Sequence, residues 1–595
     1  MKQLPLALAP AFVVAVCGLI AGIPSPAAEP GKMGSIQPQD WPSYNHDAAG
    51  WRFNPAESAL SPDNVPRLEE KWRFPPTGAD FEIGAVHATP VVVDGYVYFG
   101  TANKPAFYKL TPDGRIKWSC KLTEKDDRAL DSVNTGVCGS ALVTEDAVYF
   151  ATVSGIVYSL DRFSGKERWR LDMRSEVFPD AHQMNGTLAS PILADGRIIV
   201  AGGALEQIIS AVLPAYRGHT GRGFVMALDP NDGRIVWKYD VGPKPEPLDP
   251  PITIKDAWGE HVFHFGPASS TIWSTPSYDA ATQTIYFGTD ASNAPRRPTK
   301  DDPRLDTKYA CACVAIDARD GSEKWVTQIN PGDVWNTSML AYDPAAGRYL
   351  DQSIGDTPKV YTIDVKGTPT KAVGFGCKNG GYYVLRAGDG KMLEHTPLYL
   401  GKPKYPLDPP PDARILALPS PIGGLQTGCA TDGKSVFTNG IDALLLGTQA
   451  IPNTSTPITA GRVTAISLDT RSEHWRHNRP KVESAGGPPP LPVNKNAADP
   501  VASGIAAANG VVFFTTLTSN KLVALDAASG KVLRELDLPP VWSGPSVSRG
   551  RVYVGTGNIV IPDLKFACPQ RSSGVAFSFG LPGEDEVERL DGGDE

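Results

Sequence analysis

The chain has 595 residues, 41% of them hydrophobic, so it is long enough for one very large domain or several smaller ones. Its 59 glycines and 55 prolines make it rich in turns, and no long amphipathic helical pattern runs through it. A net charge of −8 without a basic stripe argues against nucleic acid as a partner. The composition therefore favours a large all-β protein that does not bind nucleic acid.

Residues 1–28 have the pattern of an export signal. Lys2 gives a positive start, residues 4–23 are largely apolar, and small residues precede Glu29. We expect cleavage near Ala28 and a mature chain that is periplasmic or secreted; an uncleaved membrane anchor is the alternative. No later stretch is long and apolar enough to span a bilayer, so we expect no membrane span in the mature chain.

Eight cysteines are present, one of them inside the predicted leader. The remaining odd number leaves at least one thiol unpaired in an oxidising compartment. Cys120 and Cys138 could form a disulfide. Cys311 and Cys313 alternate along a predicted strand, so both would point to one face and a bond between them would be strained. No CxxCH motif occurs, so the chain carries no covalently attached c-type haem.

A short motif recurs along the chain: an apolar pair, an Asp, a turn with Gly, and then a Trp. The clear copies cover residues 108–118, 158–169, 226–237 and 314–325, and weaker copies cover residues 383–395, 464–475 and 523–535. Each copy follows a predicted β-hairpin, which gives about four short strands per repeat. Repeats at this spacing indicate a β-propeller, in which the Trp gives each blade an apolar contact with its neighbour.

The number of blades depends on the two ends of the chain. A final hairpin at residues 543–557 has no motif of its own. If residues 41–72 supply the missing strand, the ring closes with eight blades and leaves no exposed sheet edge. The alternative is a seven-bladed ring with an N-terminal arm. We predict an all-β, eight-bladed β-propeller over residues 29–570 and an acidic, partly disordered tail over residues 571–595.

Long polar insertions interrupt the repeats. They cover residues 204–221, 243–266, 290–306, 397–424 and 476–500. A structural propeller needs only short turns at these places, so we expect the insertions to build a rim over one face of the ring, where function tends to lie. The insertion at residues 290–306 holds more Asp than a plain turn needs, and it lies between predicted strands at residues 284–288 and 312–316.

The repeat with its Trp, together with the opening WPSYNHDAAGWRFNP, resembles the pyrroloquinoline quinone (PQQ)-dependent dehydrogenases from about residue 41 to residue 557. The nearest branch is the one with the polyvinyl alcohol dehydrogenases. The motifs that indicate this branch are PAYRGHTGRGFVMALD, GPASSTIWSTPSYD, PGDVWN, GGLQTGCATDG and NGVVFFTTL. Cofactor-free assembly lipoproteins have similar blades, so the repeat is more specific for the fold than for the activity.

The resemblance implies oxidation of an alcohol by PQQ, which lies on the ring axis with a divalent cation, usually Ca²⁺. The cation polarises the reactive carbonyl while a carboxylate takes the alcohol proton. The substrate would be a small-molecule or polymeric alcohol, secondary alcohols included. Because no haem motif is present, electrons would pass to an external acceptor such as a cytochrome c.

Four positions match the site of the family. Trp273 matches the indole on which the cofactor stacks, and Lys378 matches the cation that faces the quinone oxygens. Glu206 matches a carboxylate metal ligand suited to Ca²⁺, and Asp306 matches the general base. Each has a structural alternative: Trp273 as a blade-docking aromatic, Glu206 as a solvated carboxylate, Asp306 as a turn cap and Lys378 as an exposed hairpin residue.

The sequence also departs from the family. A common second metal ligand falls on Ala291, and Asp290 or Asn293 could replace it. Ala129 and Leu130 stand where two adjacent cysteines are often found. The other departures are Thr135, Gly218, His219 and Thr427. Two functions therefore stay open: an alcohol dehydrogenase that uses PQQ and Ca²⁺, or a catalytically silent propeller that binds a protein or a polymer.

Overall fold

The computed structural model describes residues 35–583 apart from internal gaps, and the chain from Ser35 onward forms one compact unit. The gaps are residues 123–135, 174–184, 205–219, 257–258, 267–269, 293, 295–304, 306, 335–341, 344–347, 350–351, 399–414, 417–422, 443–444, 447–459, 484–498 and 558–572. The described residues contain one short 3₁₀ helix, Val65–Arg67, and no helix in them could cross a membrane. All other regular structure in this part of the chain is β-strand.

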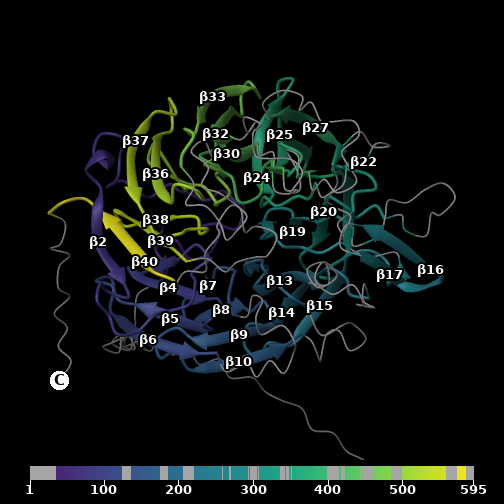
Figure 1. Ribbon diagram of the computed structural model, residues 1–595, viewed down its shortest axis with the longest axis horizontal. Helices are drawn as coiled ribbons and strands as arrows, with labels where there is room; N and C mark the ends of the chain where they lie inside the picture. Colours follow the sequence, from purple (N-terminus) through teal and green to yellow (C-terminus); the bar gives the residue numbers. More distant parts are fainter. Residues whose placement is uncertain are drawn as a thin grey trace, which may run out of the picture. The chain divides into compact units, whose positions relative to one another are not determined.

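Eight antiparallel four-stranded sheets follow one another around a ring in chain order (Figure 1). Blade 1 contains β3 (Val91–Val93), β4 (Tyr96–Thr101), β5 (Ala106–Leu110) and β6 (Ile116–Lys121). Blade 2 contains β7 (Leu142–Val143), β8 (Ala147–Ala151), β9 (Ile156–Asp161) and β10 (Glu167–Asp172). Blade 3 contains β12 (Ile192–Ala194), β13 (Arg197–Ala204), β14 (Phe224–Leu228) and β15 (Ile235–Asp240). Blade 4 contains β18 (Ser277–Asp279), β19 (Thr284–Gly288), β20 (Ala312–Asp317) and β21 (Glu323–Gln328).

The second half of the ring repeats the pattern. Blade 5 contains β24 (Lys359–Val365), β25 (Thr368–Gly376), β26 (Gly381–Arg386) and β27 (Met392–Pro397). Blade 6 contains β29 (Ala430–Thr431), β30 (Ser435–Asp442), β32 (Ala460–Ser467) and β33 (Glu473–Asn478). Blade 7 contains β34 (Ala506–Ala508), β35 (Val511–Thr515), β36 (Lys521–Asp526) and β37 (Val532–Asp537). Blade 8 contains β38 (Ser546–Ser548), β39 (Arg551–Gly555), β40 (Ala576–Gly580) and β2 (Glu69–Phe74).

Further strands extend two blades or form separate ribbons. β1 (Phe53–Asn54) adds to blade 7, and β11 (Asn185–Gly186) adds to blade 3. The two-stranded ribbons are β16 (Glu246–Asp256) with β17 (Gly259–Gly266), β22 (Tyr342–Asp343) with β23 (Arg348–Tyr349), and β28 (Ile415–Leu416) with β31 (Leu445–Leu446). β16 and β17 lie within the insertion predicted at residues 243–266, and β28 lies within the one at residues 397–424. β22 and β23 lie between blades 4 and 5, and β31 lies between β30 and β32 of blade 6.

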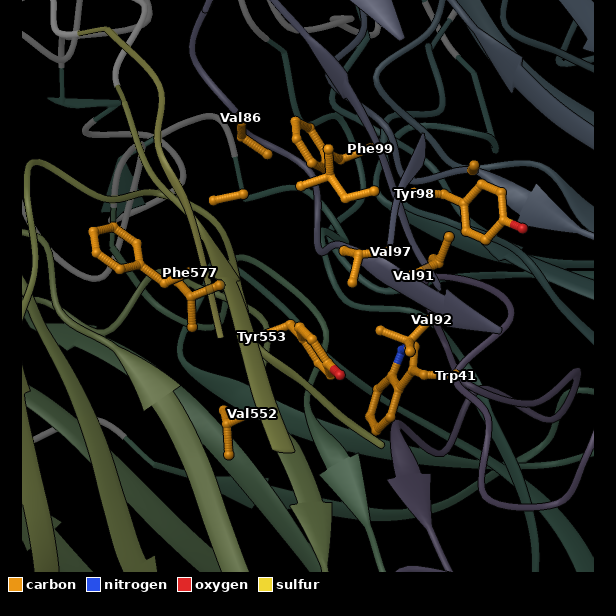
Figure 2. Close-up of a cluster of buried hydrophobic side chains, with 14 of the residues drawn as sticks. Trp41, Val86, Val91, Val92, Val97, Tyr98, Phe99, Val552, Tyr553 and Phe577 are labelled. Atoms are coloured by element: carbon orange, nitrogen blue, oxygen red, sulfur yellow. The ribbon is translucent and has the colours of Figure 1, made fainter. Parts of the chain in front are cut away.

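Blade 8 is built from both ends of the propeller. β2 pairs with β40, and the pairing runs from Glu69 opposite Gly580 to Phe74 opposite Ala576. The predicted eight-bladed closure by the N-terminal segment is therefore confirmed. Buried side chains from the first and last blades, among them Val92 and Tyr553, meet in one cluster with Trp41 of the N-terminal segment (Figure 2).

The C-terminal boundary needs a correction. β40 lies inside residues 571–595, which we expected to be a tail, so the propeller extends at least to Gly580. The alternating apolar side chains of this strand are buried, whereas the sequence contains no Asp-turn-Trp motif there. Residues 584–595, which carry most of the acidic character, lie outside the described residues.

The recurring Trp packs on the turn of the next blade at six of the eight joints. Trp237 of blade 3 donates its indole N–H to the carbonyl of Ala318 at 3.0 Å. A Cβ on Gly321, where φ is +74°, would lie 2.6 Å from the same indole, so only Gly lets the ring lie flat on this turn. The same pairing joins Trp72 with Gly114, Trp118 with Gly165, Trp169 with Gly233, Trp325 with Gly390, and Trp475 with Gly530. The Trp and the Gly of the motif are thus two halves of one contact between blades.

Residues 41–54, called here the closing segment, cross the ends of the first strands of the blades. Its backbone carbonyls accept hydrogen bonds from one blade after another. The donors are Val92 to Trp41 (2.8 Å), Val143 to Pro42 (2.9 Å), Tyr278 to Ala48 (2.7 Å), Val360 to Ala49 (2.9 Å), Thr431 to Trp51 (2.9 Å) and Ala507 to Arg52 (3.0 Å). The Asn54 amide donates to the Val547 carbonyl at 2.9 Å, so seven of the eight blades are bonded to this segment.

Arg52 of the closing segment is fully buried. Its guanidinium donates to the carbonyls of Tyr44, Ile505 (2.6 Å) and Pro545 (3.1 Å), and it lies 4.2 Å from the centroid of the Tyr44 ring. Burial lowers the pKa of Arg52, and interactions with Tyr44 and Asp356 counter this only in part. The carbonyl oxygens and the Tyr44 ring stabilise the buried charge. This end of the ring is therefore filled by the chain itself.

Candidate functional site

The candidate site lies at the end of the first strands that faces away from the closing segment. Trp273 and Gly355 each stand five positions before the residue of their blade that bonds to that segment, Tyr278 and Val360 respectively. At about 3.3 Å per residue of fully extended chain, this spacing corresponds to at most roughly 16 Å along the chain. A Cβ on Gly355 would lie 2.1 Å from the Trp273 indole and 2.2 Å from the Gln426 carbonyl. Blades 4, 5 and 6 thus meet closely around the edge of the indole.

Trp273 and Lys378, two of the predicted site residues, come together in the structure. The Lys378 ammonium nitrogen lies 6.0 Å from the centroid of the Trp273 ring, and the lysine is only 8% exposed. The backbone N–H of Lys378 donates to the Ser353 carbonyl at 2.9 Å. Gly424, at φ +70°, packs so closely that a Cβ there would lie 2.1 Å from the Lys378 carbonyl oxygen. Close packing therefore fixes the backbone of Lys378, from which the ammonium group extends towards Trp273.

Asp290, a predicted metal ligand, is buried two positions after β19. Its carboxylate accepts hydrogen bonds from the Thr271 hydroxyl at 3.2 Å, from the Ala291 backbone N–H at 2.9 Å and from the Ser353 hydroxyl. These contacts hold the carboxylate close to the segment that carries Trp273. Carboxylate oxygens are the donors that Ca²⁺ takes, while the buried side chain of Ala291 supplies none.

The other predicted site residues, Glu206, Asn293 and Asp306, lie outside the described residues. Their roles as metal ligands and general base stay predictions, and so does that of Asp290. Within the described part of the chain, no group of three or more His, Cys, Asp or Glu side chains could hold a metal ion. The described residues therefore fit the planar cofactor through Trp273 and Lys378, while a complete metal site would need residues beyond them.

Sequence reasoning missed Ser353 and Gly355, which stand just before β24. Ser353 connects two predicted residues, because its carbonyl accepts the Lys378 N–H and its hydroxyl donates to Asp290. Gly355 makes room for the indole of Trp273. The signal was present in the sequence as two small residues shortly before a first strand. Gly355 stands four positions before β24, as Trp273 stands four positions before β18.

Comparisons with known proteins identify the family of this chain. Residues 41–396 match the family model described as glucose/ethanol/alcohol dehydrogenase, β-propeller domain. The chain belongs to this PQQ-dependent dehydrogenase family. A second model, described as outer membrane protein assembly factor BamB, matches residues 459–564.

Curated relatives are distant. The chain is 26% identical over 415 residues to the quinohemoprotein alcohol dehydrogenase ADH-IIG of Pseudomonas putida, an alignment that covers 66% of this chain and 52% of the relative. It is 22% identical over 546 residues to the polyvinylalcohol dehydrogenase of a Pseudomonas species, with 87% of this chain and 73% of the relative covered. The chain thus spans about half the length of the quinohemoprotein relatives that it matches.

Solved structures show the same fold. The quinohemoprotein alcohol dehydrogenase of Comamonas testosteroni superposes with a TM-score of 0.66 at 20% identity, covering 91% of this chain and 80% of that one. A europium-containing methanol dehydrogenase superposes with a TM-score of 0.64 at 19% identity, covering 92% of this chain and 98% of that one. The eight-bladed quinoprotein architecture is therefore shared, while identities this low carry the fold alone.

Proposed function

We propose that this chain is an alcohol dehydrogenase that uses PQQ and Ca²⁺ and passes electrons to an external acceptor such as a cytochrome c, in the periplasm or outside the cell. The observation that carries the proposal is the approach of Lys378 to Trp273, 6.0 Å from ammonium to ring centroid. Two neighbouring blades supply these groups, so the pair depends on the assembled ring.

The two side chains suit a flat, anionic, oxygen-rich ligand. The Trp273 indole offers an apolar aromatic face on which a planar ring system can stack. The Lys378 ammonium offers a positive charge at low exposure, where a charge-assisted hydrogen bond to a quinone or carboxylate oxygen is strong. Gly355 and Ser353 hold both groups in position. When bound, PQQ would supply the capacity to accept two electrons from the alcohol carbon.

The remaining roles fall on residues that the sequence indicates. Asp306 would take the proton of the substrate hydroxyl, and Glu206 with Asp290 or Asn293 would hold Ca²⁺. The substrate would be a small or polymeric alcohol, secondary alcohols included. The long alignment with a polyvinylalcohol dehydrogenase, 87% of this chain, supports a polymeric alcohol as one member of the panel to be tested.

Cofactor titration with the full chain tests the proposal. Purified protein is mixed with PQQ and Ca²⁺, freed of unbound cofactor, and assayed for dye reduction with primary, secondary and polymeric alcohols. We expect Trp273→Ala to lose PQQ retention and Trp273→Phe to keep part of it, because Phe still offers a stacking face. Trp118→Phe, which changes an indole at a blade joint, is the matched control and should retain PQQ. Equal PQQ binding by Trp273→Ala and the wild type would contradict the proposal.

A second test separates chemistry from binding. Asp306→Asn should keep PQQ and lose turnover by about two to four orders of magnitude, the usual contribution of a general base. Glu206→Gln should instead weaken PQQ retention, with partial recovery in excess Ca²⁺. Loss of PQQ in Asp306→Asn, with turnover otherwise intact per bound cofactor, would remove Asp306 from the role of base.

Two observations favour the second candidate function, a silent propeller that binds a protein or a polymer. Ala291 is buried and offers no oxygen where a metal ligand is common, and residues 459–564 match the model of an assembly factor. In that case the wild type would retain no PQQ at any Ca²⁺ concentration and would reduce no dye with any alcohol.

A further inference from the structure

Two thiols from neighbouring blades meet at the joint between blade 4 and blade 5. Cys311 stands directly before β20, and Cys377 follows β25. Their Sγ atoms lie 3.8 Å apart, and both side chains are fully buried in one apolar cluster. Within the described residues, no other pair of sulfurs lies this close.

The same polar groups surround both sulfurs. Each thiol donates to the Gln352 carbonyl, Cys311 at 2.7 Å and Cys377 at 2.9 Å. The Asn330 amide donates to the Cys311 sulfur at 3.0 Å, to the Cys377 sulfur at 3.7 Å and to the Gln352 carbonyl at 3.2 Å. The two side chains therefore point to one spot, which is the arrangement that a covalent bond requires.

We propose that Cys311 and Cys377 form a disulfide that links blades 4 and 5 in the mature protein. A bonded pair has its sulfurs about 2.05 Å apart, so each sulfur needs to move only ~0.9 Å, which a modest change of side-chain torsion provides. Bond formation removes two thiol donors from the Gln352 carbonyl. That carbonyl keeps the Asn330 amide as its donor, so no buried acceptor is left without a partner.

The step is an exchange with an external disulfide, either oxidised glutathione or an exported thiol–disulfide oxidoreductase. One thiolate attacks the oxidant and forms a mixed disulfide, and the second thiolate displaces the oxidant's sulfur. The two S–H bonds are lost with two protons and two electrons, and the oxidant's S–S bond is reduced to two thiols. Burial raises the pKa of the Cys311 thiol, so the folded protein offers little thiolate and the bond should form during folding.

The bond would act on the candidate site through chain connectivity. Lys378 directly follows Cys377, and blade 4 carries Trp273 on the segment before its first strand. A link between the blades would therefore hold the lysine against the blade that presents the indole. The bridge spans 66 positions of sequence, a long loop whose closure restricts the unfolded chain.

Peptide mapping of the full chain tests the bond without relying on export or on PQQ. The protein is refolded from denaturant in a glutathione redox buffer, its free thiols are blocked with N-ethylmaleimide, and it is digested with trypsin without reductant. We expect peptide 309–319, YACACVAIDAR, to be linked to peptide 372–378, AVGFGCK. Fragmentation between Cys311 and Cys313 identifies the bonded sulfur. Cys313→Ala should keep the linked peptide, and Cys377→Ala should abolish it.

The outcomes are distinct. Recovery of both peptides with N-ethylmaleimide on every cysteine after refolding in the glutathione buffer would overturn the proposal. A linked peptide that contains Cys313 in place of Cys311 would overturn it as well. A linked peptide in protein that retains no PQQ would leave the disulfide standing and count against the proposed function alone. Reductant should lower the Tm of the wild type and leave the Tm of Cys377→Ala unchanged.

Discussion

The two ends of the first strands are built in different ways. At one end, the closing segment offers backbone carbonyls to one blade after another, and the buried Arg52 is bonded to backbone carbonyls. At the other end, the contacts are made by particular side chains, above all Trp273 and Lys378. Backbone hydrogen bonds persist through most side-chain substitutions, whereas a site made of side chains is lost when one of those side chains is replaced. The same eight repeats thus provide stability at one end of the ring and a candidate site at the other.

Removal of the Arg52 guanidinium should have the largest effect on stability. Arg52→Met leaves the carbonyls of Tyr44, Ile505 and Pro545 without donors in the interior, which should lower the free energy of unfolding by about 3–5 kcal/mol. Urea denaturation measures the change, and Arg115→Met, at an exposed position, is the control. A loss below about 1 kcal/mol would show that the backbone contacts of the closing segment suffice without this side chain.

A methyl group at Gly355 should disturb the site end by a smaller amount. The new Cβ would meet the Trp273 indole at 2.1 Å, so Gly355→Ala should cost about 1–3 kcal/mol and displace the indole. Gly388→Ala is the matched control, because a Cβ there has no neighbour within 4 Å. Urea denaturation measures the free energy of unfolding of both variants, and PQQ titration measures their affinity for the cofactor. Unchanged PQQ affinity in Gly355→Ala would mean that the indole does not form the stacking platform.

The sequence predicted the ring because the repeats are local. An Asp, a Gly and a Trp within a dozen residues reveal a blade, and the N-terminal segment could be assigned to closure because one hairpin had no motif. The strand β40 was missed since it lacks this motif and is recognisable only once β2 pairs with it. The closing segment was missed as a unit because its partners, such as Pro276 for Asn45, lie hundreds of positions away.

The site was predicted only in part, for a similar reason. Trp273 and Lys378 were found through resemblance to a family, since nothing local in either motif indicates that the two side chains meet. Ser353 acts through its backbone carbonyl, and Gly355 acts by leaving room for the Trp273 indole. A motif of side chains shows neither effect. The pairing of Cys311 with Cys377 depends on how two blades pack, so a count of cysteines could not reveal it.

Acid should lower the stability of the fold at the closing segment, because His46 is buried there in its neutral form. Burial lowers the pKa of His46 to about 4, and its ring packs edge-on against Trp41 with centroids 5.0 Å apart. Since this folded pKa lies below the ordinary value near 6.5, the neutral ring contributes stability above pH 6.5 that is lost as the pH falls. Between pH 8 and pH 5 the contribution of His46 should fall by up to about 2 kcal/mol.

His46→Asn isolates this effect, because Asn tolerates the positive φ of 70° at this position. The neighbouring Asp47 has the opposite influence: burial raises its pKa to about 6, so its protonation stabilises the fold as the pH falls. Both proteins contain Asp47, so the difference between their free energies of unfolding reports on His46. A difference that stays constant from pH 8 to pH 5 would show that the imidazole is not held neutral.

The smallest change in stability is expected at Lys378, although the effect on binding should be large. Lys378→Met keeps the length and apolar stem of the side chain, so the free energy of unfolding should change by less than about 1 kcal/mol. The lost charge should weaken PQQ binding by about 10–100-fold, the size of one charged hydrogen bond, and Lys378→Arg should recover part of it. Urea denaturation and PQQ titration of the same samples measure both quantities. If Lys378→Met destabilised the protein as strongly as Arg52→Met, the lysine would be a structural element, and the contrast between the two ends of the ring would disappear.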